Sequence, residues 1–405
     1  MSVLSGKKIV LGVSGGIAAY KTATLVRLFI KAGAHVQVIM TPASKDFVTP
    51  LTLSTLSKNP VYSTFYNEED ENAQWNNHVE LGLWADLMVI APATANTLSK
   101  MANGNCDNLL IATYLSAKCP VYFAPAMDLD MYKHPSTISS FALLKEFGNI
   151  MIPAESGELA SGLSGEGRMA EPENIITFVE RDLESKLPLE GKKILITAGP
   201  TYEAIDPVRF IGNHSSGKMG FDIAIAAANL GAAVTLVSGP THLTVANSDI
   251  NLIRVTSAKE MYDACHEFFD ATDVAICAAA VADYKPKFQA LQKIKKKEDE
   301  FTIELEKTLD ILASLGEIKQ KQLLIGFALE TENEIENAKL KIQKKNLDLI
   351  VLNSLQDEGA GFGKPTNKIT FIDSNFKIEP MDLKSKELVA VDIMNKVISH
   401  YEKNS

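Results

Sequence analysis

Short runs of aliphatic and β-branched residues recur along the chain, and segments with a helical period of apolar positions separate them. Uninterrupted apolar runs of this length predict strands of a parallel sheet that is covered on both faces. In the first half the predicted strands are Lys8–Val13, His35–Met40, Leu87–Ala91 and Val121–Ala124. In the second half they are Ile194–Thr197, Val234–Ser238, Val274–Ala278, Leu323–Phe327 and Leu349–Leu352, with Ile369–Ile372 as a candidate antiparallel addition.

Helical periodicity falls between these strands, as in Ile17–Lys31, Lys218–Leu230 and Glu332–Lys345. Strands that alternate with helices are joined by right-handed crossovers when the strands run parallel. The pattern therefore predicts the α/β class, with doubly wound, mostly parallel, Rossmann-like sheets.

This pattern begins twice in the chain. KKIVLGVSGG at Lys7–Gly16 and KKILITAGPT at Lys192–Thr201 are both apolar runs that end in a glycine turn, and a similar second strand follows each. The second half carries a longer segment before its first helix, which the stretch TYEAIDPVRFIGNHSS supplies in whole or in part. Pro188 and Gly191 bracket a short polar link. We therefore expect two domains, residues 1–190 and 191–405.

Composition narrows the functional classes. The 405 residues carry a formal net charge of -10, which disfavours a nucleic-acid binder because phosphate contacts need a basic surface. No apolar run approaches the ~18 residues of a membrane span, and the N-terminus lacks a signal-peptide cleavage site. The four cysteines form no CxxC pair, so a cysteine zinc site is not expected. These features are typical of a cytoplasmic enzyme that acts on small molecules.

The first glycine turn, GVSGG at Gly12–Gly16, opens the first predicted helix. Such a turn presents backbone N–H groups and a helix N-terminus to an anion, but it is equally a tight strand-to-helix connection. It is not GxGxxG, and no acidic residue closes the following strand to bind a ribose, which disfavours an NAD-dependent oxidoreductase. A mononucleotide fits the turn better than a dinucleotide does.

The first half resembles the flavin-dependent cysteine decarboxylases over nearly all of its length. The motifs that carry the resemblance are GVSGGIAAYK, NHVEL, APATANTLSKMANGNCDNLL and PAMDLDMY, in this order. The resemblance implies FMN as the cofactor, held at its phosphate by Ser14 and Gly15 and at a flavin-contacting loop by Thr94, Asn96 and Thr97. It also implies that His78 is catalytic and that Met127 and Asp128 bind the substrate. Oxidation of the substrate thiol to a thioaldehyde would provide a C=S group that accepts the electrons left when carbon dioxide departs.

Two positions depart from the family pattern. Where the family has PAMN, with an amide for the substrate carboxylate, this chain has Asp128, so that side chain must be protonated, paired with a cation or turned away. Where the family has a proton-donating cysteine in a substrate loop, the chain has Ser161, and an alcohol is a far weaker acid than a thiol. These departures leave open a second interpretation, in which the first half is a flavin-binding module without turnover.

A second glycine-containing stretch needs to be distinguished from a P-loop. Gly212–Met219 reads GNHSSGKM, which is one residue short of that motif and ends on Met219, which has no hydroxyl for magnesium. A P-loop is therefore disfavoured. The hydroxyls of Ser215 and Ser216, with Lys218 at a helix start, still suit phosphate or carboxylate binding.

The second half resembles phosphopantothenate–cysteine ligase over essentially its full length. The motifs are AGPTYEAIDPVRFIGNHSSGKMG, CAAAVADY, KIKKK, GFALET and KIQKKNLDLIVLN. The resemblance implies that a nucleotide, usually CTP, activates the carboxylate as an acyl-cytidylate, and that Asn213 and Lys293 are catalytic. It implies a magnesium contact at Asp283 and a binding set of Ala278, Ala279, Ala280, Asp283, Lys293, Asp310, Ile311, Phe327, Lys341 and Lys345. The sequence does not separate CTP from ATP.

The order of the two halves resembles that of the bifunctional enzymes of bacterial coenzyme A biosynthesis. The resemblance implies that cysteine is ligated to 4'-phosphopantothenate and that the product, 4'-phosphopantothenoylcysteine, is decarboxylated to 4'-phosphopantetheine. The implied partners are 4'-phosphopantothenate, L-cysteine and CTP, with Mg2+ and FMN as cofactors. A homo-oligomer is also implied, with flavin sites at subunit contacts and dimeric ligase halves.

Overall fold

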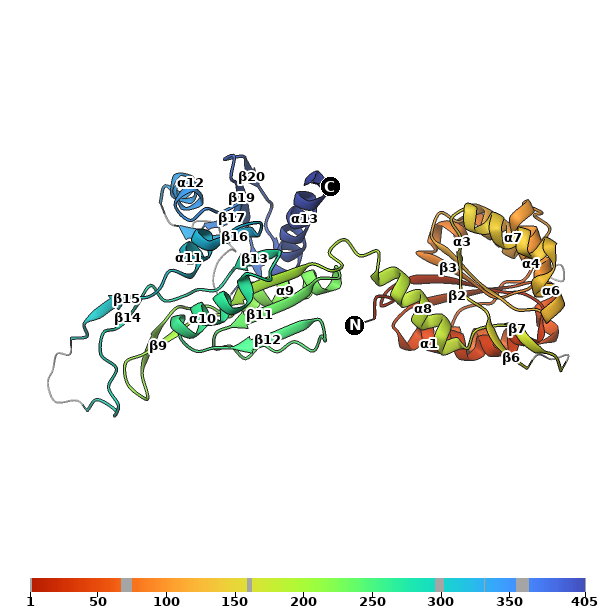
Figure 1. Ribbon diagram of the computed structural model, residues 1–405, viewed down its shortest axis with the longest axis horizontal. Helices are drawn as coiled ribbons and strands as arrows, with labels where there is room; N and C mark the ends of the chain where they lie inside the picture. Colours follow the sequence, from red (N-terminus) through yellow and green to blue (C-terminus); the bar gives the residue numbers. More distant parts are fainter. Residues whose placement is uncertain are drawn as a thin grey trace. The chain divides into compact units, whose positions relative to one another are not determined.

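The computed structural model describes residues 2–66, 75–158, 162–295, 302–330, 332–354 and 364–404. The chain divides into two compact units, Met1–Glu184 and Ser185–Ser405 (Figure 1). Hydrophobic core clusters of buried residues lie within one unit or the other, two in each. In the described part of the chain, every helix is too short or too polar to cross a bilayer.

The first unit is built on a five-stranded parallel sheet in the order β2-β1-β3-β4-β5. Its strands are β1 (Lys8–Val13), β2 (His35–Met40), β3 (Leu87–Ala93), β4 (Val121–Pro125) and β5 (Ile150–Met151). The strand order reverses between β1 and β3, so the crevice at their carboxyl ends is where a doubly wound sheet binds its ligand. This is the order found in flavodoxin-like sheets.

Helices cover both faces of this sheet. They are η1 (Ile17–Lys21), α1 (Thr22–Lys31), η2 (Pro42–Asp46), α2 (Pro50–Ser57), α3 (His78–Trp84), α4 (Ala95–Asn103), α5 (Leu109–Ser116), α6 (Leu129–Lys133), α7 (Pro135–Glu146) and α8 (Pro172–Glu184). Within β1, Ile9 and Leu11 pack with α1 and α8 on one face, whereas Val10 packs with α4, α5 and α7 on the other. Burial on both faces is the reason that the strand is uniformly apolar.

A short antiparallel hairpin follows β5 in the first unit. Its strands are β6 (Glu155–Glu158) and β7 (Ser164–Arg168). The Met127 amide donates to the Gly167 carbonyl at 3.0 Å, which joins the hairpin to the turn after β4. A side chain at position 167 would meet the Met127 carbonyl oxygen at 2.4 Å, so glycine permits this close approach.

The second unit has an eight-stranded sheet in the order β12-β11-β8-β13-β16-β17-β19-β20. The six strands from β12 to β17 in this order run parallel. β19 pairs antiparallel with β17, and β20 pairs antiparallel with β19. The bounds are β8 (Lys193–Ala198), β11 (Ala233–Ser238), β12 (Ile250–Arg254), β13 (Val274–Cys277), β16 (Leu323–Glu330), β17 (Leu349–Ser354), β19 (Ile369–Asp373) and β20 (Ile378–Pro380).

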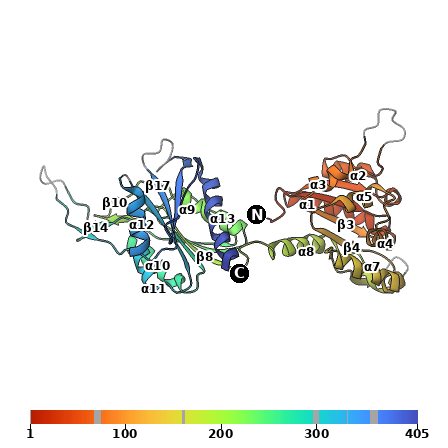
Figure 2. The ribbon, with the colours of Figure 1, turned by 90° about the horizontal axis from the view of Figure 1, so that it is seen from above.

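Five helices and three small ribbons complete the described part of the second unit. The helices are α9 (Lys218–Asn229), α10 (Ala258–Phe269), α11 (Ile311–Ile318), α12 (Glu334–Lys344) and α13 (Lys386–Asn404). The ribbons pair β9 (Tyr202–Ala204) with β10 (Phe210–Gly212), β14 (Tyr284–Pro286) with β15 (Leu305–Lys307), and β18 (Thr366–Asn367) with β21 (Lys384–Ser385). Figures 1 and 2 both show the β14/β15 ribbon as an arm that extends away from the large sheet.

These observations confirm the predicted α/β class with two mostly parallel sheets, and the antiparallel addition at β19. The segment predicted as one helix over Ile17–Lys31 consists of the 3-10 helix η1 followed by α1. The extra segment of the second half forms the β9/β10 hairpin between β8 and α9.

Candidate active sites

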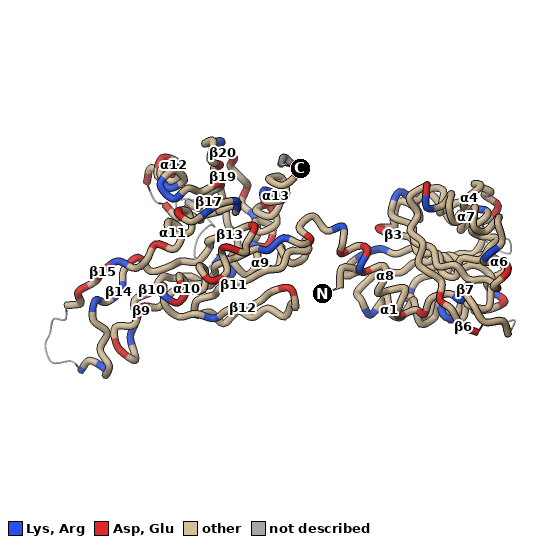
Figure 3. The backbone as a smooth tube through the Cα atoms, in the orientation of Figure 1, with Lys and Arg blue, Asp and Glu red and all other residues tan. Residues whose placement is uncertain are grey.

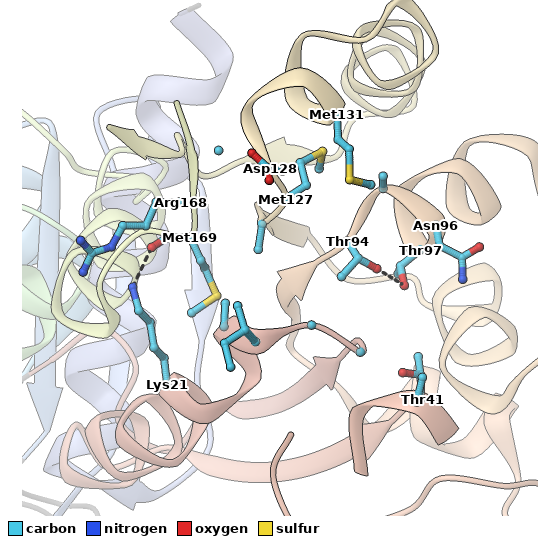
Figure 4. Close-up of a pocket in the computed structure, with 18 of the residues that line it drawn as sticks. Lys21, Thr41, Thr94, Asn96, Thr97, Met127, Asp128, Met131, Arg168 and Met169 are labelled. Atoms are coloured by element: carbon cyan, nitrogen blue, oxygen red, sulfur yellow. Dashed lines mark hydrogen bonds between the residues drawn. The ribbon is translucent and has the colours of Figure 1, made fainter. Parts of the chain in front are cut away.

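A cavity of about 940 Å³ lies at the carboxyl ends of β1, β3 and β4 in the first unit (Figure 4). The turns after these three strands and the β6/β7 hairpin line it. Among the residues that the sequence places at the flavin and substrate sites, it contains Gly15, Thr94, Asn96, Thr97, Met127 and Asp128. Residues distant in the sequence thus meet at the crevice where a doubly wound fold binds a nucleotide.

Ser14 lies behind the wall of this cavity and joins two of its turns. Its hydroxyl donates to the Pro92 carbonyl at 2.7 Å and accepts from the Thr94 amide at 3.0 Å. The side chain is fully buried and does not line the cavity. A Cβ at Gly15 would lie 2.7 Å from the Ala43 Cβ, so only glycine leaves the turn this close to η2.

The start of α4 forms a second wall of the cavity, directly beside the glycine turn. The Thr94 hydroxyl donates to the Thr97 hydroxyl at 3.3 Å, while Asn96 is exposed. This wall offers short polar side chains, and the glycine turn offers backbone amides. A cavity with a few converging polar groups of this kind is suited to a flavin mononucleotide.

Asp128 ends the turn after β4 and caps α6. Its Oδ1 accepts a hydrogen bond from the Leu129 amide at 2.6 Å. The side chain is half-buried and lines the cavity beside Met127 (Figure 4). Among the described residues, none forms an ion pair with Asp128.

A three-residue ionic cluster at the base of the hairpin was not among the residues singled out from the sequence. Lys21 is 6% exposed, and its Nζ donates to the Met169 carbonyl and to Glu171 Oε1, both at 3.0 Å. Glu171 also accepts from Arg168, and the hydrogen bond from Lys21 is the main cause that lowers the Glu171 pKa. A lysine inside the apolar pattern of GVSGGIAAYK was the signal that could have revealed it.

His78 is the first residue of α3 and does not line the cavity of its own chain. Asn77, not His78, caps the helix by accepting from the Val79 and Glu80 amides at 3.0 and 3.4 Å. His78 Nδ1 is buried without a hydrogen-bond partner among the described residues, and the ring lies edge-on to Phe65 at 6.0 Å. Ser161, the other expected catalytic residue of this half, lies outside the described residues.

A second cavity, of about 780 Å³, lies in the second unit, at the carboxyl ends of its parallel strands. It is lined by most residues expected at the nucleotide: Asn213, Ala278, Ala279, Ala280, Asp283, Asp310, Ile311, Phe327, Lys341 and Lys345. The amides of Ala279 and Ala282 donate to the hydroxyls of Thr197 and Thr201 at 3.1 and 3.0 Å, which holds the turn after β13 in place.

Asn213 joins the β9/β10 hairpin to that turn. Its amide nitrogen donates to the carbonyls of Ala280 and Val281 at 3.1 and 3.0 Å. Its amide oxygen is therefore directed away from these two acceptors. The residue occupies the edge between the hairpin and the turn, and it lines the second cavity together with both.

The two expected phosphate-binding lysines, Lys341 in α12 and Lys345 at its C-cap, are both paired with carboxylates. Lys345 Nζ lies 2.8 Å from Asp310 Oδ2, and Lys341 pairs with Glu330. Burial alone would raise the pKa of Asp310, but the hydrogen bonds from Lys345 and the Ala313 amide outweigh it and hold that pKa below its usual range. The sequence did not reveal the pairing of Lys341 with Glu330, because Glu330 lies on a different element, β16.

Asp283, the expected magnesium contact, is exposed and lines the second cavity, and its carbonyl accepts from the Thr308 amide at 3.0 Å. No group of three metal-ligating side chains was found among the described residues.

Lys293 lies in the segment between β14 and β15, is exposed and does not line the second cavity. This segment is fastened to the β9/β10 hairpin. Asp206 accepts from the Ile294 amide at 3.1 Å and Arg209 donates to the Ile294 carbonyl at 3.0 Å. Asp206 and Arg209 also pair with each other. Neither was singled out from the sequence, although both stand in the AGPTYEAIDPVRF motif.

A further charged cluster lines the edge of the second cavity, at the start of α9 and α13. Lys218 lies 3.1 Å from Asp222 and 2.9 Å from Glu387, and Lys386 is 6% exposed beside them. Burial raises the pKa of Asp222 and lowers that of Lys386. The cluster balances two lysines against two carboxylates, so Lys218 is held by protein partners and is not an isolated phosphate-binding cation.

Two family models match the chain, one for each unit. Residues 2–184 match the model described as Flavoprotein. Residues 189–401 match the model described as DNA/pantothenate metabolism flavoprotein C-terminal domain. The protein is therefore a two-domain flavoprotein of pantothenate metabolism.

Similar proteins cover the whole chain. The "Coenzyme A biosynthesis bifunctional protein CoaBC" of Bacillus subtilis is 44% identical over 98% of this chain and 97% of its own length. A "Cysteine/Cysteine sulfinic acid decarboxylase" from an unknown prokaryotic organism is 55% identical over 87% of this chain and 99% of its own length. The solved C-terminal domain of a CoaBC protein is 44% identical, with a TM-score of 0.47, and covers 54% of this chain and 100% of that one.

The chain belongs to the family of bifunctional coenzyme A biosynthesis proteins. It combines a phosphopantothenoylcysteine decarboxylase in its flavoprotein domain with a phosphopantothenate–cysteine ligase in its second domain.

Proposed function

We propose that residues 191–405 activate 4'-phosphopantothenate with CTP and Mg2+ and join it to cysteine, and that residues 1–190 then decarboxylate the product with FMN. The observation that carries the proposal is that there are two separate cavities, one in each unit, and that each is lined by most of the residues assigned to cofactor or substrate binding in that unit. The reaction at the second cavity requires a nucleotide, because the substrate carboxylate must carry a leaving group before the amine of cysteine can displace that group.

In the first cavity, the glycine turn and the start of α4 hold the FMN. When bound, the flavin takes up and returns the electrons of the substrate's thiol-bearing carbon. The chain positions the thiol and carboxylate, excludes water and supplies protons. We assign His78 to proton transfer or charge stabilisation near the thiol, and Ser161 to the position from which the last proton is delivered, directly or through a water molecule.

In the second cavity, like charges must meet when the substrate carboxylate attacks the nucleotide, so cations are required. We assign this role to Lys293, Lys341 and Lys345, with Asp283 holding the metal ion. The carboxylates Glu330 and Asp310 hold Lys341 and Lys345 in defined positions before the phosphates arrive. Asn213 then acts on the acyl-cytidylate, because it stands where the β9/β10 hairpin meets the Ala280 turn.

We infer that the working enzyme is a homo-oligomer with dimeric ligase halves. Large apolar side chains stay exposed on the β9/β10 hairpin, on the β14/β15 arm and in the segment that follows β14: Val208, Phe210, Phe288, Leu291 and Leu305. Exposed apolar groups gathered on one projection are typical of an interface. In the first unit, the absence of His78 from the cavity of its own chain supports flavin sites that are completed by a neighbouring copy. Light scattering on the whole chain measures the assembly.

The relative named as a cysteine decarboxylase supports a second candidate for the first half, the decarboxylation of free cysteine. The two candidates share the flavin and the thiol chemistry and differ in what is attached to the cysteine nitrogen. Asp128 lines the first cavity and has no cationic partner among the described residues, so its carboxylate is compatible with either candidate substrate.

A mass-resolved assay with the whole enzyme tests the proposal. The enzyme is supplied with 4'-phosphopantothenate, cysteine, CTP and Mg2+, and the products are followed in time. The expected sequence is an acyl-cytidylate, then phosphopantothenoylcysteine, then phosphopantetheine with release of carbon dioxide. Replacing CTP by ATP tests the nucleotide. Accumulation of phosphopantothenoylcysteine without carbon dioxide would reduce the first half to a flavin-binding module.

A further inference from the structure

The two nitrogens of the His78 ring have different surroundings. Nδ1 is buried without a hydrogen-bond partner, and among the described residues it is the only nitrogen of this ring in that state. A substrate cannot reach Nδ1 while the ring keeps its position, because the atom has no surface open to solvent. Nε2 is therefore the nitrogen through which His78 can contact a substrate.

The surroundings of Nδ1 also decide which nitrogen of the neutral ring carries the proton. An N–H at Nδ1 would be a buried donor without an acceptor in the described part of the chain, and such a donor costs its full desolvation. A buried acceptor without a partner is tolerated somewhat better than a buried N–H. The neutral ring therefore carries its proton on Nε2, where it is a hydrogen-bond donor.

An aromatic side chain borders this ring. The centroids of His78 and Phe65 lie 6.0 Å apart with their planes at 89°, the edge-to-face arrangement that aromatic pairs favour. Trp75 in turn stacks on Phe65, at 5.2 Å and 21°. Within the described residues no hydrogen bond holds the imidazole, so the contact with Phe65 orients it.

Hydrogen bonds fix the backbones of both rings. The Asn76 amide donates to the Phe65 carbonyl at 2.7 Å, and Asn76 Nδ2 donates to the Thr64 carbonyl at 2.8 Å. Asn77 caps α3, which fixes the start of the helix and with it the backbone of His78. The two rings are therefore held at their positions before any substrate binds.

Resting on the assignment of His78 to the decarboxylation, we propose that Phe65 is a positioning residue for that reaction. It holds the His78 ring so that Nε2–H donates a hydrogen bond to the negative charge on the substrate sulfur. Of the two roles considered for His78, this one is charge stabilisation. No bond to His78 forms or breaks, and the proton of the thiol goes to solvent.

The tautomer is tested first, on the whole enzyme with FMN bound. Solid-state NMR of protein labelled with 15N-histidine should show a protonated Nε2 and a bare Nδ1 for the signal that disappears in His78→Asn. The side-chain amide of glutamine reaches the place of Nε2, whereas that of asparagine reaches only the place of Nδ1. His78→Gln should therefore keep carbon dioxide release within roughly tenfold of wild type, since one hydrogen bond is retained, and His78→Asn should fall much further.

The role of Phe65 is tested by a double-mutant cycle. Phe65→Leu should lower kcat for carbon dioxide release about 2- to 10-fold, the rate equivalent of one edge-to-face contact, and leave KM and FMN binding unchanged. Phe65→Tyr retains the ring and should recover most of this loss. In the His78→Asn background Phe65→Leu should have no further effect, because Phe65 acts through His78. Phe147→Leu is the matched control, since it removes an exposed ring at the end of α7 in the same unit.

The outcomes separate this inference from the assignment on which it rests. Unchanged carbon dioxide release in His78→Asn would remove His78 itself from the reaction. A protonated Nδ1, or a His78→Gln variant as slow as His78→Asn, would show that His78 transfers a proton and would overturn the inference. Equal slowing by Phe65→Leu in both backgrounds, or no slowing in either, would show that Phe65 does not act through His78. The NMR result on wild type stays decisive should a variant fail to fold.

Discussion

At the scale of single residues, His78 has a buried ring nitrogen, Nδ1, with no hydrogen-bond partner among the described residues. A polar atom left in this state costs free energy, and it is retained when a ligand or a catalytic step uses it. His78→Asn should therefore keep the fold and the FMN but slow carbon dioxide release by roughly 10²- to 10⁴-fold, the usual contribution of a positioned acid or base.

Flavin absorbance and carbon dioxide release, measured on the same sample, check this expectation. Ligation of cysteine to phosphopantothenate is the internal control, because its cavity lies in the other unit. Unchanged carbon dioxide release in the variant would remove His78 from the mechanism.

Lys293 and Asn213 separate the two half-reactions of the ligase. Lys293→Gln should slow acyl-nucleotide formation about a hundredfold, since one cationic contact to developing charge contributes ~3 kcal/mol. Asn213→Asp should instead let the acyl-nucleotide form and persist. Trapping the intermediate by mass spectrometry distinguishes these results.

Lys287→Gln is the matched control for this pair. Lys287 lies beside the same arm but is exposed and paired with Glu304 at 3.4 Å, an ion pair that contributes little. It should leave both half-reactions unchanged. Accumulation of acyl-nucleotide in Lys293→Gln, with none in Asn213→Asp, would mean that the two roles are reversed.

The residues expected at the nucleotide come from four separate motifs, and the structure brings them to one cavity. The sequence made part of this grouping predictable, since Ala278 and Asp283 follow the carboxyl end of β13, and ligands of doubly wound sheets bind at the carboxyl ends of the strands. What it did not reveal are the partners. Glu330, Glu171 and Asp206 are ordinary acidic residues in the sequence, and only folding places each beside its cation.

At the scale of elements, long apolar strands were predictable and short polar ones were not. The β1 and β2 strands have the predicted bounds, because burial on both faces makes most of their residues apolar. By contrast, β6 and β7 read ESGE and SGEGR, without apolar alternation. Their pairing depends on tertiary contacts such as the hydrogen bond between Met127 and Gly167. The hairpins that shape both cavities were therefore the elements that the sequence concealed.

The β9/β10 hairpin fastens the lysine loop through Asp206. The carboxylate accepts from Arg209 and from the amides of Val208 and Ile294, and these bonds, with Arg209 the largest cause, lower the Asp206 pKa. A lowered pKa means that the stabilisation is complete above the usual value of ~4 and is lost as pH falls below it. Asp206→Asn should therefore loosen the loop at pH 7, and the difference from wild type should shrink below pH ~4.

Amide hydrogen exchange of Ile294, corrected for its intrinsic pH dependence, measures this loosening directly. We expect lower protection in Asp206→Asn at pH 7, together with slower ligation and unchanged decarboxylation. Equal protection of Ile294 in the two proteins at pH 7 would show that Asp206 does not hold the loop.

At the scale of the whole molecule, basic and acidic residues are both spread along the described backbone of each unit (Figure 3). On the β14/β15 arm, Lys285 lies 3.1 Å from Glu306 across the two strands. At the second cavity, Lys341 and Lys345 are likewise each paired with a carboxylate, Glu330 and Asp310. Acidic and basic side chains therefore stand next to one another where the anionic nucleotide of the proposed reaction would approach.

The two units should also function when they are separated. Each of the four core clusters lies within a single unit, two in the first and two in the second, so neither unit contributes buried apolar residues to the other's core. The division between Glu184 and Ser185 falls in the segment after α8, and the family matches end and begin on either side of it.

Residues 1–184 made alone should bind FMN and decarboxylate supplied phosphopantothenoylcysteine, and residues 185–405 should ligate cysteine with CTP and Mg2+. We expect each rate within a few-fold of that of the whole chain, and the mixed halves should carry out both steps through a freely diffusing intermediate. Product analysis with each half and with the mixture is the measurement, and the intact chain is the control. If either half is inactive alone but recovers when the other is added, the units depend on each other and the proposed division of labour between them is wrong.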